Sequence, residues 1–389
     1  MTPLAGPHME EPETLRSPFA KLAGDLDGLR EVSRLRSLCT PTGIDFSSND
    51  YLALADSERL KAAVGAAVER GVSVGSGGSR LLRGNHPEHE RLEMEAANFF
   101  GCESTLFMAS GYAANSALLS TLPQRGDIIF YDELIHASAH EGMRFARAET
   151  RSIAHNDVQA FADVLRHWQD NSAAGTPWVS VETLYSMDGD RAPLTDLLEL
   201  ADRYGAVLYA DDAHATGVWG EGGRGLAADL DGRTNTIVLR TCGKALGCEG
   251  ALLCGPTIMR DHLVNRARGF IFSTAPSPLM AACVREALKI VTEEPERREG
   301  LASLVNYAGE RLTSLGVEKT GSQIMPLVLG SEVRTMAAAE RLQRRGFDVR
   351  GIRPPTVPQG SSRLRISLTL NVVRDEIDAL GGALEEIIR

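Results

Sequence analysis

A lysine follows an apolar run near residue 240 and lies among small residues. The run 236–239 predicts a buried strand, and Thr-Cys-Gly-Lys-Ala-Leu-Gly at residues 241–247 comes soon after it. A lysine that forms a Schiff base needs an amine that is both reachable and partly desolvated. A position just past a buried strand meets both needs, whereas a solvated surface charge explains it poorly. Lys244 is therefore a candidate nucleophile toward a carbonyl compound.

A second charged group follows another apolar run. Asp211-Asp212-Ala213-His214 comes shortly after the apolar run 206–209, which predicts a buried strand. Open α/β sheets bind their ligands at the carboxyl ends of the strands. A carboxylate in such a place costs free energy unless it meets a cation. We therefore expect Asp211 to face a protonated ring nitrogen of a ligand.

A possible phosphate site precedes both residues. Ser110-Gly111-Tyr112 follows the apolar run 106–108 and opens a predicted helix. Free N–H groups and the positive end of the helix dipole favour anions at such a junction. Taken alone, the segment is better explained as an ordinary turn between a strand and a helix.

Three other patterns match known functional motifs but lack the context that those motifs require. Residues 71–75 match the G-x-S-x-G elbow of serine hydrolases, which needs a strand before its serine and a helix after it. Here an amphipathic helix precedes and a Gly/Ser loop follows, so we predict a flexible loop. The pairs His86/His89 and His136/His140 have helix-compatible metal spacing, but no third ligand accompanies either pair. We predict no metal site.

The elements that must position these groups alternate along the chain. Apolar residues spaced three and four apart predict a helix from Ser57 to Gly71, and Pro193 opens another that ends at Gly205. Short apolar runs without alternation lie between the helices, at 106–108, 128–130, 179–181, 206–209 and 236–239. Such runs predict strands that are buried on both faces. The fold class is therefore α/β, with a mostly parallel sheet covered by helices on both sides.

The sequence pattern changes near residue 296. Arg/Glu-rich helical segments surround the apolar run 325–329 and the alternating stretch 364–368. This pattern predicts a smaller α+β domain. We predict an N-terminal arm over 1–45, a large domain over 46–290 and a small C-terminal domain over 291–389.

Composition excludes several classes of protein. The 389 residues carry a net charge of −11, which argues against nucleic acid as a partner. No run of about 18 apolar residues is present, and the first residues lack a signal-peptide pattern. The six cysteines form no CxxC pair. We expect a cytoplasmic enzyme.

The order of the chemical groups resembles a known family. A phosphate-binding turn, a strand-end Asp about 100 residues later and a strand-end Lys about 30 residues beyond it are similar to pyridoxal-phosphate enzymes of the aspartate-aminotransferase fold, fold type I. From Phe46 to the C-terminus, the chain resembles the α-oxoamine synthases, which condense an amino acid with an acyl thioester and release carbon dioxide. The resemblance is carried by segments 46–52, 75–80, 110–112, 136–138, 186–190, 211–214 and 243–245.

This resemblance implies roles for individual residues. Lys244 would hold pyridoxal 5'-phosphate covalently, Asp211 would keep its ring nitrogen protonated and His136 would stack on the ring. The remaining cofactor contacts would be Ser186 and His214 to the phenolic oxygen, with Gly111, Tyr112, Thr241 and Thr274 at the phosphate. Thr274 would reach the site of a neighbouring subunit, which implies a homodimer with shared sites. The implied substrate-binding residues are Asn49, Arg353 and Arg365, although a surface arginine on a strand also explains Arg365.

One segment narrows the choice among the substrates that this family uses. Residues 352–358 are similar to the branch of the family that condenses L-alanine with a pimeloyl thioester in biotin biosynthesis, with the acyl group on coenzyme A or a carrier protein. The alternatives are a sister enzyme of the glycine C-acetyltransferase, 5-aminolevulinate synthase or serine palmitoyltransferase type, and a non-catalytic binding protein. Cys242, Cys248, Glu249 and Asn371 depart from the family pattern, which bears on the acyl substrate.

Overall fold

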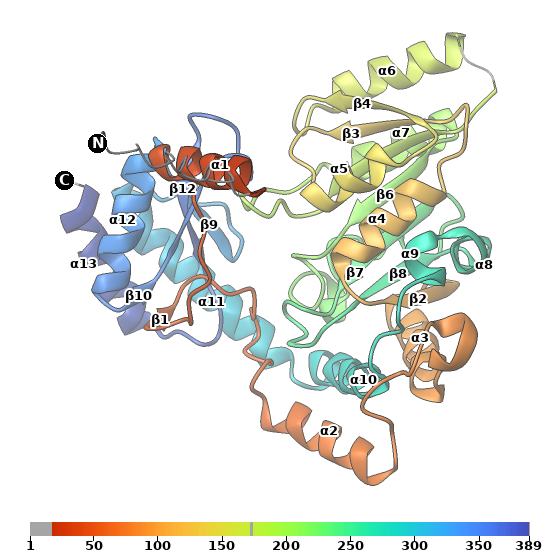
Figure 1. Cartoon of the computed structure of the whole chain (residues 1–389), viewed down its shortest axis with the longest axis horizontal. Helices are drawn as coiled ribbons and strands as arrows, with labels where there is room; N and C mark the ends of the chain where they lie inside the picture. Colours follow the sequence, from red (N-terminus) through yellow and green to blue (C-terminus); the bar gives the residue numbers. More distant parts are fainter. Residues whose placement is uncertain (1–17, 172–173, 389) are drawn as a thin grey trace, which may run out of the picture.

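A seven-stranded sheet forms the centre of the larger lobe (Figure 1). The computed structural model describes residues 18–171 and 174–388. The strands are ordered β2-β8-β7-β6-β5-β3-β4, and only β8 runs antiparallel to its neighbours. Their bounds are β2 (Ser104–Met108), β3 (Ile128–Asp132), β4 (Glu149–Ile153), β5 (Pro177–Glu182), β6 (Val207–Asp211), β7 (Thr236–Thr241) and β8 (Ala251–Gly255). The predicted α/β class with a mostly parallel sheet is confirmed.

Helices cover both faces of this sheet, which is why its strands carry no polar alternation. One face packs on α4 (Gly111–Thr121), α5 (Ala137–Arg144), α8 (Thr257–Arg266) and α9 (Arg268–Ile271). The other face packs on α3 (Pro87–Phe100), α6 (Val158–Asn171), α7 (Leu194–Tyr204) and α10 (Pro278–Glu293). Strands β2, β5, β7 and β8 are buried along their whole length.

The C-terminal lobe holds a smaller antiparallel sheet, β11-β12-β9, in which β12 is central. Its elements are α11 (Pro295–Leu312), β9 (Ile324–Gly330), α12 (Glu332–Arg344), β10 (Phe347–Asp348), β11 (Arg350–Ile352), β12 (Ser362–Ser367) and α13 (Arg374–Ile388). The N-terminal strand β1 (Ile44–Asp45) pairs in parallel with β10, so the end of the predicted arm lies on this lobe. The three domain boundaries stay predictions.

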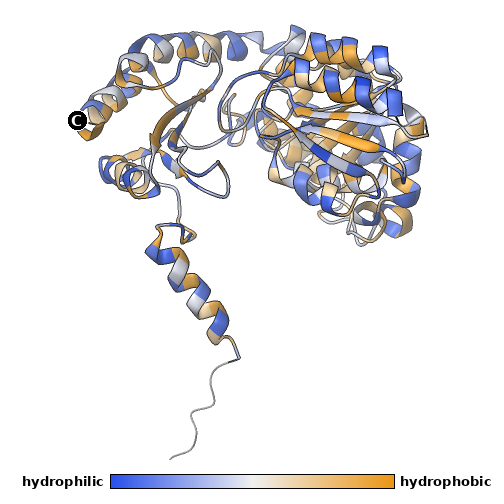
Figure 2. Ribbon diagram, turned by 90° about the horizontal axis from the view of Figure 1, so that it is seen from above, coloured by the Kyte–Doolittle hydropathy of each residue, from blue (hydrophilic) through white to orange (hydrophobic). Residues whose placement is uncertain are grey.

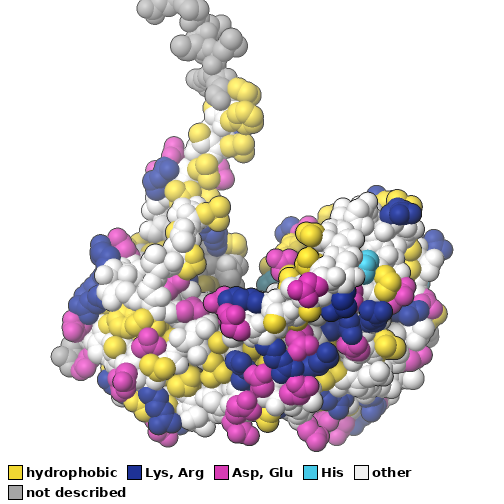
Figure 3. Space-filling view, turned by 90° about the horizontal axis from the view of Figure 1, so that it is seen from below, with side chains coloured by type: hydrophobic (Ala, Val, Ile, Leu, Met, Phe, Trp, Pro, Cys, Tyr) yellow, Lys and Arg dark blue, Asp and Glu magenta, His cyan; other side chains and the backbone are white. Residues whose placement is uncertain are grey.

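Two predicted helices are found where their apolar spacing placed them. Helix α2 (Glu58–Glu69) follows Ser57, and α7 ends at Gly205, whose φ of 62° needs a residue without a side chain. Helix α1 (Ala20–Glu31) has no buried residue and projects from the body, with hydrophobic side chains along it (Figures 2 and 3). The short helices are η1 (Arg80–Gly84), η2 (Glu221–Gly223), η3 (Ala228–Leu230) and η4 (Thr313–Leu315). None of the helices in the described ranges is long and apolar enough to cross a membrane.

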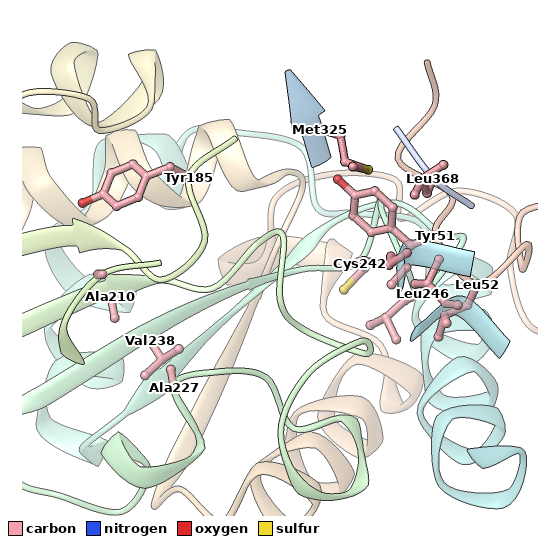
Figure 4. Packing of buried hydrophobic residues seen from close by; sticks show 14 of the residues in the cluster. Tyr51, Leu52, Tyr185, Ala210, Ala227, Val238, Cys242, Leu246, Met325 and Leu368 are labelled. Atoms are coloured by element: carbon pink, nitrogen blue, oxygen red, sulfur yellow. The ribbon is translucent and has the colours of Figure 1, made fainter. Parts of the chain in front are cut away.

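One apolar core joins the two lobes. Tyr51 lies between Cys242 and Leu246, which flank Lys244 in sequence, and Met325 and Leu368 of the C-terminal lobe (Figure 4). All five side chains are almost completely buried. The loop that carries Lys244 is therefore supported from both lobes.

A buried arginine lies on the face of the sheet that packs on α3. Arg240 pairs with Asp212 at 3.1 Å and with Asp231 at 2.7 Å, and its guanidinium lies 4.0 Å from the centre of the Phe100 ring. All three charged side chains are buried. Arg240 thus compensates two carboxylates in the interior, with Arg224 as a second, more distant partner of Asp231 at 3.5 Å, which makes Arg240 hard to replace.

Replacing Arg240 should therefore destabilise the fold strongly. Arg240→Met leaves the buried Asp212 without its cation and Asp231 with only the longer contact to Arg224, so we expect the free energy of unfolding to fall by about 3–5 kcal/mol in urea denaturation. Arg345, in an exposed pair with Glu386, provides the matched control, and Arg345→Met should cost less than about 1 kcal/mol. Equal effects of the two substitutions would contradict this account.

Candidate active site

The N-terminus of α4 meets the end of β7. Ser110 caps the helix, because its hydroxyl accepts a hydrogen bond from the N–H of Ala113 at 3.1 Å. A methyl group added to Gly111 would lie 3.7 Å from Oγ1 of Thr241, so these two residues are neighbours. The first N–H groups of a helix have no partner within it. Gly111, Tyr112 and Thr241 can therefore bind an anionic group such as a phosphate.

The same helix holds a carboxylate. Asp211, at the end of β6, is buried and accepts hydrogen bonds from Nδ2 of Asn115 at 2.8 Å and from the N–H of Ala213 at 3.0 Å. The Tyr209 hydroxyl donates to Oδ1 of Asn115 and so fixes the orientation of that amide. Helix α4 thus supplies both an anion site at its first residue and a donor to Asp211 one turn later.

Lys244 lies close to this carboxylate. Desolvation lowers the pKa of its amine to about 8, against the opposing attraction of Asp211 and Glu182. The side chain is half-buried, and its amine has no hydrogen bond or ion pair with the described residues. An amine with these properties is a usable nucleophile and base near neutral pH.

His214 and Tyr51 form a buried pair beside Lys244. The Tyr51 hydroxyl and Nδ1 of His214 are 2.7 Å apart. Burial, then the positive charges of Lys244 and Arg365, lower the pKa of His214 well below its usual value. His214 is therefore neutral and can offer a hydrogen bond to a ligand.

Arg365 reaches this cluster from the other lobe. Its Nε donates to the carbonyl oxygen of Ser186 at 2.7 Å, and its Nη2 donates to Oδ1 of Asn49 at 3.1 Å. The side chain is buried, so the alternative of a surface arginine is wrong. Arg365 forms no ion pair with a carboxylate of the described residues, and a buried unpaired guanidinium suits an anionic ligand such as a carboxylate.

His136 caps α5 on the same side of the sheet. Its Nδ1 lies 2.7 Å from the Ser138 hydroxyl. Partial burial lowers the pKa of its ring, and the ring is close enough to Asp211 and Lys244 for their charges to act on it. The residue is partly open to solvent, which leaves room for a planar ligand to stack on its ring.

Two of the predicted site residues lie apart from this cluster. The Arg353 guanidinium donates to the carbonyl oxygen of Leu35 at 2.8 Å and also contacts Met336. Thr274 is exposed between α9 and α10. Its predicted role requires a second subunit, so the assignments of Arg353 and Thr274 stay predictions.

Sequence reasoning missed four polar residues of the cluster. Tyr51 and Asn115 lie within or next to segments that carried the family resemblance, but no role was assigned to them. Tyr209 is the donor to Asn115, and Glu182 is a buried carboxyl at the end of β5. The rule that identified Asp211, a charged residue at the end of an apolar strand, applies equally to Glu182.

Comparison with known proteins places the chain in a family. The family model for aminotransferase class I and II matches residues 41–383. The chain belongs to this family. It is 41% identical to an 8-amino-7-oxononanoate synthase of Chromobacterium violaceum over 372 residues, which covers 92% of this chain and 95% of that protein. It is 44% identical to a protein of the same name from Anaeromyxobacter over 389 residues, which covers 97% of this chain and 94% of that protein.

Solved structures agree with this assignment. A serine palmitoyltransferase from S. paucimobilis with PLP and myriocin bound has a TM-score of 0.86 at 25% identity, covering 96% of this chain and 98% of that one. An 8-amino-7-oxononanoate synthase from Francisella tularensis has a TM-score of 0.73 at 28% identity, covering 89% and 96%. The predicted fold type I and the predicted family are confirmed. The roles of single residues stay predictions.

The lowered pKa of Lys244 can be measured directly. In protein freed of small molecules, labelling of Lys244 by an amine-selective acylating reagent should rise with pH about a midpoint near 8, since only the neutral amine reacts. Peptide mass spectrometry gives the midpoint for each lysine. Lys61 is the control, because its hydrogen bonds to Asp56 and Glu58 raise its pKa. A midpoint for Lys244 at or above that of Lys61 would contradict the described desolvation.

Proposed function

We propose that this protein is a pyridoxal-phosphate-dependent 8-amino-7-oxononanoate synthase. It condenses L-alanine with a pimeloyl thioester and releases carbon dioxide and the free thiol, which is a step of biotin biosynthesis. The observation that carries the choice of substrates is the 41–44% identity to proteins of this name over more than nine tenths of the chain. The buried Arg365 near Lys244, which forms no ion pair with a carboxylate of the described residues, supports an amino-acid substrate with a free carboxylate.

The residues present fit the cofactor. When bound, pyridoxal phosphate withdraws electrons from the α-carbon of the amino acid attached to it. Lys244 would hold the aldehyde carbon, and the carboxylate of Asp211 would keep the ring nitrogen protonated. The other proposed contacts are His136 on the ring face, Ser186 and His214 at the phenolic oxygen, and Gly111, Tyr112 and Thr241 at the phosphate.

Arg365 and Asn49 would orient the amino acid. Two N–H groups of a guanidinium match the two oxygens of a carboxylate, so Arg365 can fix the alanine carboxylate. The Lys244 amine, released when alanine takes its place, would then accept the α-proton as a general base. Its pKa near 8 suits both the acceptance and the later return of a proton. Arg353 is proposed as a further substrate residue, which requires release of its contact with Leu35.

The proposed condensation forms one carbon–carbon bond and breaks two bonds of the substrates. The alanine α-carbon forms a bond to the thioester carbonyl carbon as the carbon–sulfur bond breaks and the thiolate leaves. The bond from the α-carbon to the carboxylate then breaks, carbon dioxide leaves, and a proton returns to the α-carbon. The pimeloyl group would arrive on coenzyme A or on a carrier protein, and the enzyme would act as a homodimer in which Thr274 completes the phosphate site of the second copy.

One observation favours a second candidate. The serine palmitoyltransferase structure has the higher TM-score of the two neighbours described, although its identity to this chain is lower. A sister enzyme that joins serine or glycine to another acyl thioester would use the same cofactor residues. The choice between them depends on the substrate pocket alone.

Asp211 should be essential for turnover. Asp211→Asn keeps the shape but removes the negative charge that holds the ring nitrogen protonated. We expect kcat to fall by about 100-fold or more, as is typical when a preorganised electrostatic contact is lost. The cofactor affinity, measured by absorbance titration, should change much less, because Lys244 and the phosphate contacts remain. Asp229→Asn, on the surface, is the control. Near-normal turnover of Asp211→Asn would show that another group holds the ring nitrogen.

The substrate assignment is tested by a matrix of amino acids and acyl thioesters. Alanine, glycine and serine are combined with pimeloyl, acetyl, succinyl and palmitoyl thioesters, and kcat/KM is measured with product mass. Pimeloyl with alanine should be preferred, while glycine should retain weak activity because one methyl group discriminates by only about 1–3 kcal/mol. If glycine with a short acyl thioester, or serine with palmitoyl, is better by tenfold or more, the pimeloyl assignment is wrong.

A further inference from the structure

A second carboxyl group lies beside Asp211. Glu182 is the last residue of β5 and is in register with Asp211, the last residue of the neighbouring parallel strand β6. Side chains in register on adjacent strands point to the same face of a sheet. Both groups are buried, with exposed fractions of 2% for Glu182 and 5% for Asp211. Two carboxyl groups therefore share one buried edge of the sheet next to Lys244.

Asp211 accepts more hydrogen bonds than Glu182. Asp211 accepts one hydrogen bond on each oxygen, from Asn115 and from Ala213. Glu182 accepts one, on Oε2 from the N–H of Ser186 at 3.1 Å. Its Oε1 is buried and has no partner among the described residues. Hydrogen bonds from donors favour the charged form of a carboxyl group, so the negative charge belongs on Asp211.

The surroundings of Glu182 also disfavour a second charge. Burial raises its pKa well above the usual value, the charges of Asp211 and Asp132 raise it further, and the positive charge of Lys244 opposes them. The other titratable groups on which its charge acts are the phenols of Tyr185 and Tyr209, which are neutral. Two buried carboxyl groups this close cannot both ionise at moderate cost.

We propose that Glu182 keeps its proton in the working enzyme and so confines the negative charge at this edge of the sheet to Asp211. Glu182 is then a positioning residue, since it acts through Asp211 and Lys244. Lys244 faces one carboxylate rather than two, which keeps its amine from being held as an ammonium ion. The inference deepens the proposed function, because the catalytic use of that charge rests on it, but the proton on Glu182 can be observed without any substrate.

The proton can be detected by infrared spectroscopy. The C=O stretch of a protonated carboxyl group is distinct from the bands of a carboxylate, and it shifts when the protein is transferred to D2O. A difference spectrum between the parent protein and Glu182→Gln should contain this band at neutral pH. The control is Glu310→Gln, at an exposed position, which should show only the loss of carboxylate bands. The absence of a protonated-acid band from the Glu182 difference would overturn the proposal.

Stability against pH gives an independent measurement. A raised pKa means that the folded state holds a proton that the unfolded chain has lost, so the parent loses stability as pH rises above the usual carboxyl value. Glu182→Gln has no such proton. From about pH 6 upward, the Tm of the parent should therefore fall relative to that of Glu182→Gln, by about 2 °C per pH unit, until Glu182 ionises in the folded state. Parallel Tm curves would overturn the proposal.

A third measurement distinguishes a positioning role of Glu182 from a purely structural one. In the parent, ionisation of Glu182 at alkaline pH should bring a second negative charge beside Lys244, with a change in the absorbance of the bound cofactor. The pH dependence of the cofactor's absorbance should therefore differ between the parent and Glu182→Gln, and identical profiles would overturn the proposal. If these three measurements succeed while alanine and pimeloyl thioester do not react, the proposed function fails and the proton assignment stands. The opposite outcome leaves the function intact and removes Glu182 from it.

Discussion

The site depends on one negative charge held in the interior of the protein. Asp211 lies where water cannot solvate it, so the charge persists only because fixed dipoles surround it. The amide of Asn115, the N–H of Ala213 and the hydroxyl of Tyr209 behind Asn115 supply those dipoles. These donors come from α4, β6 and the turn after β6. The charge on Asp211 is therefore stabilised only when these elements are packed together. In the proposed function, a protonated heterocycle beside Asp211 would complete the compensation of this charge.

The positive side of the site is assembled from two lobes. Lys244 lies in the loop that follows β7 of the large sheet, and Arg365 belongs to β12 of the small one. Their separation is set by the shared apolar core, in which Tyr51 packs against residues of both lobes. The same Tyr51 touches His214 through its hydroxyl. Relative movement of the lobes would therefore disturb the hydrogen bonds of the site.

Local sequence patterns predicted the large sheet and two residues of the candidate site, because those residues follow closely on apolar strands. The apolar runs that became β6 and β7 placed Asp211 and Lys244 at the same edge of a sheet. Arg365 was less predictable. Its alternation with Leu364 and Ile366 placed it opposite the packed face, but β12 is buried on both faces and the opposite side faces the large lobe. The contact of Arg353 with Leu35 joins residues more than 300 positions apart, and no local pattern could reveal it.

Asp211 and Asp212 are adjacent in sequence but lie in different electrical environments. Strand geometry directs Asp211 toward α4 and Asp212 toward Arg240, with the sheet between them. A slip of β6 by one residue would move one aspartate into the other's place and leave the second aspartate where Ala210 or Ala213 lies now, so that one buried carboxylate would lose its partners. Misfolded pairings of this strand are thus penalised twice, by packing and by charge. The two consecutive aspartates therefore favour the native register of β6 over the adjacent ones, whether or not a cofactor is bound.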